Sequence, residues 1–196
     1  GREALFAQNA GADAYNIAIG DLAGKSITTS IKNVIIGGLA GDALTSGSKN
    51  TVVGYEALST EDTRGTSTAI GHRALRDQNA GSDPYNVAVG HDAGLSISTG
   101  IKNTLVGGLA GDALNGGGNN VAIGYAALST EDGHSANVAV GYQALTTQNA
   151  GADAYNVAVG YNAGQAVTTG GNNTLLGAFA GDALTTGGSN VAIGRS

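Results

Sequence analysis

The chain has 196 residues, of which 34 are glycine, and it contains one proline and no cysteine, methionine or tryptophan. Charged residues make up 12% and the formal net charge is −6. This composition excludes a helical bundle, because each glycine in a helix interior costs about 1 kcal/mol. It excludes collagen, which needs glycine at every third position. The absence of cysteine excludes disulfides and thiolate sites. The acidic balance argues against a nucleic-acid partner, and no apolar run is long enough to insert into a membrane.

A short unit, Asn-x-x-[Val/Ile/Leu]-Gly, repeats along the whole chain. Its closing glycine, here called the frame glycine, recurs at steps of 17 or 19 residues. Three short steps and one long step make a super-repeat of 70 residues, and Gly1 fits the same frame. The frame glycines are Gly20, Gly37, Gly54, Gly71, Gly90, Gly107, Gly124, Gly141, Gly160, Gly177 and Gly194.

Each unit predicts the same elements in the same order. The five residues from Asn to the frame glycine are rich in β-branched residues and predict a strand, first at 16–20 and last at 190–194. An Ala-Leu or Ala-Gly pair then opens a second short strand or a turn, and a Thr-, Ser- or Gly-rich loop closes the unit. A unit of 17–19 residues is too short for two packed helices and suits one turn of a solenoid.

We therefore expect an all-β protein, a parallel β-solenoid or β-roll of eleven turns whose strands stack at about 4.8 Å. Residues 1–196 form a single repeat domain in this interpretation. Because the chain starts inside a repeat, we expect it to be a fragment of a longer fibrous protein.

Both faces of the predicted strands are apolar. Ile17 and Ile19 lie on one face and Ala18 between them faces the other way, and the intervening residue is apolar in every unit. A sheet that is apolar on both faces must be covered on both, and a narrow roll covers only its inner face. The pattern favours a homo-oligomer. A monomer is the alternative, because the intervening residue is mostly alanine, which is cheap to expose.

Two further columns follow from stacking identical turns. We interpret the first as a structural ladder of stacked amides, formed by Asn16, Asn33, Asn50, Asn86, Asn103, Asn120, Asn137, Asn156, Asn173 and Asn190. The second contains aromatic rings directly after the frame glycine and is a candidate ligand or interface column. Its members are Tyr55, His72, His91, Tyr125, Tyr142 and Tyr161. Such rings can fill an interface between chains or stack on sugar faces, and we favour the interface.

The remaining polar groups predict no catalytic, cofactor or metal site. Glu61-Asp62 and Glu131-Asp132 are the densest acidic spots, and we interpret them as solvated loops, with a weak cation site as the alternative. The three histidines show no Ser-His-Asp or His-x-x-x-His grouping. Nearly every polar feature recurs with the repeat or stands alone, whereas an acid/base cluster would break the repeat. We therefore expect no enzyme activity and no cofactor.

The repeat resembles known surface fibres. Asn120-Val-Ala-Ile-Gly124 and Asn190-Val-Ala-Ile-Gly194 are similar to the head repeats of trimeric autotransporter adhesins of the YadA type. Gly171-Asn-Asn-Thr-Leu-Leu-Gly177 is similar to repeats of phage and virus tail fibres. The resemblance implies a left-handed roll, three chains around one axis, and an extracellular place on a cell or virion surface.

The function that follows is a non-enzymatic structural or adhesive fibre segment. Its partners would be copies of itself, as a homotrimer, and a glycan or protein receptor, with no nucleic acid and no membrane insertion by this segment. The alternative is a solenoid binding module for glycan or ice. Threonine-rich loops are the feature that suggests ice, although turn chemistry also accounts for them.

Overall fold

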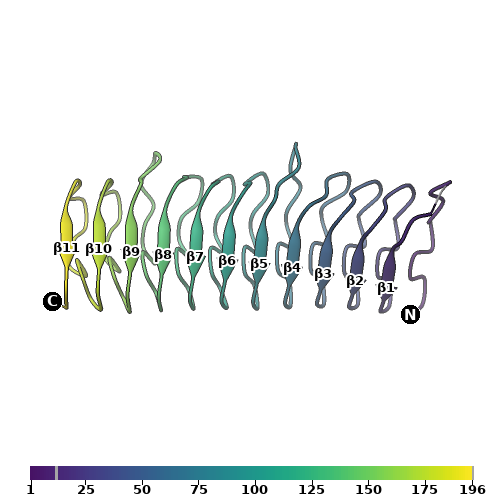
Figure 1. The fold of residues 1–196 in the computed structure, drawn as a ribbon, viewed down its shortest axis with the longest axis horizontal. Coiled ribbons are helices and arrows are strands. Elements are labelled where there is room, and N and C mark those ends of the chain that lie inside the picture. Colours follow the sequence, from purple (N-terminus) through teal and green to yellow (C-terminus); the bar gives the residue numbers. More distant parts are fainter. Residues whose placement is uncertain (12, 196) are drawn as a thin grey trace.

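The computed structural model describes residues 1–11 and 13–195 and forms a parallel β-solenoid (Figure 1). One 11-stranded sheet runs the length of the molecule, with the strands in chain order and each parallel to its neighbours. The strands are β1 Ile17–Ile19, β2 Val34–Ile36, β3 Thr51–Val53, β4 Thr68–Ile70, β5 Val87–Val89, β6 Thr104–Val106, β7 Val121–Ile123, β8 Val138–Val140, β9 Val157–Val159, β10 Thr174–Leu176 and β11 Val191–Ile193. The expected all-β parallel solenoid is confirmed.

The strands are shorter than expected. Each has three residues, because the flanking Asn and the frame glycine lie outside the regular ladder. The segment after each frame glycine is a turn and not a second strand. The described part of the chain has no helix of the length and apolarity that a membrane crossing requires.

The frame glycine marks a close approach between turns. Gly90 has φ +145°, and a Cβ on it would lie 2.4 Å from the carbonyl oxygen of Gly107 in the next turn. The same contact recurs at the other frame glycines up to Gly177. No side chain fits there, which explains the regular spacing of glycine in the sequence.

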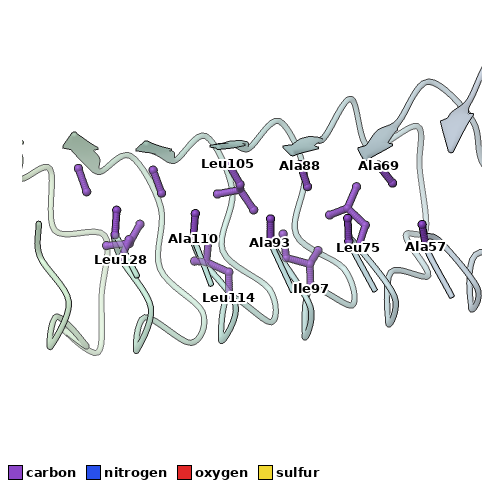
Figure 2. Packing of buried hydrophobic residues seen from close by; sticks show 14 of the residues in the cluster. Ala57, Ala69, Leu75, Ala88, Ala93, Ile97, Leu105, Ala110, Leu114 and Leu128 are labelled. Carbon is purple, nitrogen blue, oxygen red and sulfur yellow. The ribbon is translucent and has the colours of Figure 1, made fainter. Parts of the chain in front are cut away.

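The middle residue of each strand points into the roll. Ala88 and Leu105 are fully buried, and they face Ala93, Ala110 and similar residues across a thin core (Figure 2). The idea that this alanine column lies outside, on which the monomer alternative depended, is wrong. The larger β-branched residues on either side of it face outward instead.

Two of the long loops stand out from the rod. They precede β5 and β9, and they contain the two residues by which a 19-residue turn exceeds a 17-residue turn (Figure 1). The sheet continues in register past both of them, for example with Ala69 paired to Ala88 and Ala139 to Ala158. The insertion is therefore absorbed outside the core.

Candidate functional site

The outer face of the sheet is an unbroken strip of Val, Ile and Thr side chains, with one leucine, Leu176. Val87, Val106, Ile123 and Val159 are 36–39% exposed in the middle of the molecule, and polar residues do not interrupt the strip apart from threonine. We call these two columns the outer face. The first is Ile17, Val34, Thr51, Thr68, Val87, Thr104, Val121, Val138, Val157, Thr174 and Val191. The second is Ile19, Ile36, Val53, Ile70, Val89, Val106, Ile123, Val140, Val159, Leu176 and Ile193.

The residues directly after the frame glycines form two ring stacks. Tyr55, His72 and His91 stack with centroid separations of 5.7 and 4.8 Å. The three rings come from successive turns, so the stack spans three turns. The imidazoles of His72 and His91 are nearly parallel, with an interplanar angle of 9°.

The second stack contains tyrosines alone. Tyr125, Tyr142 and Tyr161 are separated by 5.5 and 5.1 Å, and the edge of Phe179 contacts Tyr161 at 5.3 Å. These tyrosines are 41–50% exposed, so each keeps part of its side chain in solvent. At the other end of the stack, Tyr125 lies over Gly108, where a Cβ would meet the ring at 3.6 Å.

Three more tyrosines were not recognised from the sequence as surface features. Tyr15, Tyr85 and Tyr155 precede the ladder asparagine in each long loop and are 70%, 56% and 55% exposed. All three have a left-handed backbone, with φ of 50–52°. Their recurrence 70 residues apart was visible in the sequence, but the turn that exposes them was not.

The asparagine column connects successive turns through the backbone. The side-chain oxygen of Asn103 accepts the N–H of Asn120 at 2.9 Å, and its Nδ2 donates to the carbonyl of Gly117 at 2.8 Å. The same pattern holds along most of the column, and at Ser67 the backbone N–H donates to the side-chain oxygen of Asn50. Direct amide-to-amide bonds occur near the ends, at Asn16–Asn33 and Asn173–Asn190.

The interpretation of the acidic spots as solvated loops is wrong for the glutamates. Glu61 and Glu131 are fully buried, because they occupy the inward position that Ile27, Leu44 and Ile97 occupy in other turns. Glu61 accepts bonds from the N–H of Arg64, the side chain of Gln78 and the N–H of Ala80. Asp62 and Asp132 lie on the opposite, outward side.

Glu131 has a different partner from Glu61. One of its oxygens contacts Nδ1 of His134, and among the described residues its Oε2 has no hydrogen-bond partner. Burial raises the pKa of the Glu131 carboxyl, and the neighbouring His134 opposes that rise. The arrangement is a buried carboxylate that is only half satisfied.

Two aspartates that recur in the repeat also have only part of their carboxylate hydrogen-bonded. Asp42 and Asp112 occupy the same place in their turns, and Oδ1 of each is buried without a hydrogen-bond partner among the described residues. Burial raises the pKa of both, to about 6 for Asp112, where the Asp92 carboxylate adds to the effect.

The loop threonines that suggested ice binding serve the stacking of turns. Thr28 Oγ1 donates to the carbonyl of Thr45 at 3.1 Å, and Thr45 Oγ1 donates to the carbonyl of Asp62 at 3.0 Å. The threonines on the outward side of the strands are Thr51, Thr68, Thr104 and Thr174, on β3, β4, β6 and β10.

Comparison with known proteins adds no relative to this picture. The chain matches no protein-family model, no curated protein and no solved structure.

Proposed function

We propose that the chain is a non-enzymatic fibre segment that associates with copies of itself through the outer face. The supporting observation is the strip of Val, Ile and Thr side chains along all eleven strands. Parallel sheets are almost always covered on both faces, and here the roll covers only one. An exposed strip of this length is typical of an interaction surface.

The finer features of the proposal rest on the resemblance to adhesin heads and tail fibres. They are a left-handed winding, a homotrimer with the three outer faces around one axis, and a place on the exterior of a cell or virion. In this arrangement the 70-residue super-repeat spaces the protruding long loops along the fibre. The loops and the turn edges then display the surface that a receptor contacts.

Sedimentation equilibrium tests the association. We expect a mass of three times the 19.1 kDa chain at micromolar concentration. Val106→Lys, in the middle of the outer face, places a charge in the interface and should dissociate the assembly. Ser82→Lys adds the same charge on an exposed long loop and should leave the mass unchanged. A wild-type chain that sediments as a monomer would remove the proposal.

A second candidate function is glycan binding through the ring stacks. The observation that favours it is the half-exposure of Tyr125, Tyr142 and Tyr161, which together form a continuous aromatic column on the surface. A glycan array tests this function directly.

For ice, the relevant surface is the outer face and not the loops, and an ice-recrystallisation assay on the Val106→Lys variant tests it.

A further inference from the structure

One group of side chains in the described part of the chain brings three potential metal ligands together. His72, His91 and Asp92 each offer a donor atom, and these atoms lie within 4.8 Å of one another. Nδ1 of His91 is 3.2 Å and Nδ1 of His72 is 3.7 Å from the Asp92 carboxylate. The group lies on two successive turns, after β4 and β5.

Asp92 is the fixed member of the group. Its side chain is 7% exposed, and Arg73 grips both of its oxygens, with Nε–Oδ1 at 2.9 Å and Nη2–Oδ2 at 2.7 Å. Each carboxylate oxygen keeps a second lone pair for another partner. Hydrogen bonds of this kind to a ligating carboxylate are usual around metal ions and hold the ligand in place.

The two histidines are the adjustable members. Their side chains are 43% and 62% exposed, so ring rotation meets little resistance. A zinc ion binds imidazole nitrogen at about 2.0–2.1 Å, which brings two such nitrogens to roughly 3.4 Å from each other. The separation in the structure exceeds this by little more than 1 Å at most, a gap that small χ rotations close.

The other copies of the repeat show that these residues change as a set. Seventy residues later, His72, Arg73, His91 and Asp92 correspond to Tyr142, Gln143, Tyr161 and Asn162. Tyr142 and Tyr161 still stack, at 5.1 Å, so the ring column does not require histidine. Seventy residues earlier, the two histidine positions hold Arg2 and Asp21, which pair with each other. Imidazole donors and a buried carboxylate therefore coincide in one copy.

We propose that His72, His91 and Asp92 form a binding site for a divalent transition-metal ion such as Zn²⁺. The three side chains supply two nitrogens and one oxygen, and water completes a four-coordinate shell from the solvent side. Arg73 positions the carboxylate. The donor set disfavours Ca²⁺ and Mg²⁺, which prefer oxygen ligands. All donors come from one chain.

Isothermal titration with zinc chloride in a non-coordinating buffer tests the proposal. We expect saturable binding of one zinc ion per chain, and no saturable heat with calcium. The matched variant replaces the four residues with those of the later copy, as His72→Tyr, Arg73→Gln, His91→Tyr and Asp92→Asn. It should lose zinc binding and keep the circular dichroism spectrum, because the same residues already stand on this backbone at 142, 143, 161 and 162.

His134 provides the control, because it is the one remaining histidine and lies in a different turn. His134→Gln should leave zinc binding unchanged. The proposal is overturned if the four-residue variant binds zinc as the wild type does, if His134→Gln abolishes binding, or if the wild type binds none at about 1 mM zinc, a concentration that reveals even weak sites.

A measurement on the unaltered protein guards against misfolding of the variant. Substoichiometric Cu²⁺ should broaden the imidazole NMR signals of His72 and His91 before that of His134. Broadening of His134 first, or of all three equally, would contradict the assignment.

Discussion

The Cδ1 of Leu114 occupies the space that a side chain on Gly111 would need: a Cβ there would lie 2.7 Å from it. This relationship explains why the alanine three residues after each frame glycine is followed by either glycine or leucine. Where it is glycine, the residue three positions later is Ile, Leu or Val and fills the core, as in Gly41–Leu44. Where it is leucine, as at Leu58 and Leu128, the later residue is Glu or Gln. The thin core holds one such bulky side chain per turn.

Gly111→Ala should therefore destabilise the protein by about 2–4 kcal/mol, through overpacking and an alanine at a left-handed φ of +57°. Gly81→Ala is the matched control, because a Cβ there meets nothing within 4 Å, and its effect should be near zero or slightly stabilising. Urea unfolding of the two variants measures the difference. Equal midpoints would show that Leu114 does not restrict this position.

The periodicity made most of the fold predictable. Asn and the frame glycine bound every strand, and a solenoid is the one common architecture with a unit this short. The face of the sheet that lies inside was not predictable. Val87, Ala88 and Val89 are all apolar, so the alternation of side chains does not distinguish the buried face from the exposed one.

The buried glutamates were missed for a different reason. A charged pair such as Glu61-Asp62 usually indicates a solvated loop. The signal that was available is the column: Glu61 stands where Ile27, Leu44 and Ile97 stand in other turns. Left-handed φ values at residues such as Leu58 and Lys102 were also unpredictable, because side chains rarely adopt them and stacking between turns imposes them here.

The two buried glutamates should respond oppositely to amidation. Glu61→Gln replaces an acceptor that three donors use, and it should cost about 1–3 kcal/mol. Glu131→Gln removes a buried charge with an unpartnered oxygen and should stabilise by about 1 kcal/mol at pH 8. Thermal melting of both variants at that pH compares them. Destabilisation of both by a similar amount would mean that the His134 contact satisfies Glu131.

Asp112 should make stability depend on pH. Its folded pKa is about 6, against 3.8 for an unperturbed side chain. The folded state holds the proton more tightly, so the free energy of unfolding falls as the pH rises from about 4 to about 6 and then stays level. Asp112→Asn removes this loss and should be more stable than the wild type by about 1–2 kcal/mol at pH 7. The difference should vanish near pH 3.5, and a difference that is constant with pH would refute it.

The asparagine ladder should matter most where it is buried. Asn103→Ala removes the acceptor for the N–H of Asn120 and the donor to Gly117, and it should cost about 2–4 kcal/mol. Asn190→Ala, at the exposed end of the column, should cost less than half as much. Denaturant unfolding measures the loss in the free energy of unfolding for each variant. Equal losses would show that burial of the ladder contributes nothing.

The tyrosine stack separates the two functions proposed for this chain. Tyr125, Tyr142 and Tyr161 directly follow the frame glycines, on the edge of the strands that carry the outer face. We therefore expect them to contact a neighbouring chain. Replacing all three with serine should shift sedimentation toward the monomer and lower the melting temperature, because each buried aromatic side chain removes about 150–250 Å² from water.

The matched control replaces Tyr15, Tyr85 and Tyr155 with serine, since these are equal in number and more exposed, and lie in the long loops. It should leave the mass and the melting temperature of the assembly unchanged. If the stack variant stays assembled, melts normally and loses binding on a glycan array, the stack binds sugar and does not lie in the interface. These outcomes differ because a ring that binds sugar must stay accessible to solvent, whereas a ring in the interface loses its solvent contact on assembly.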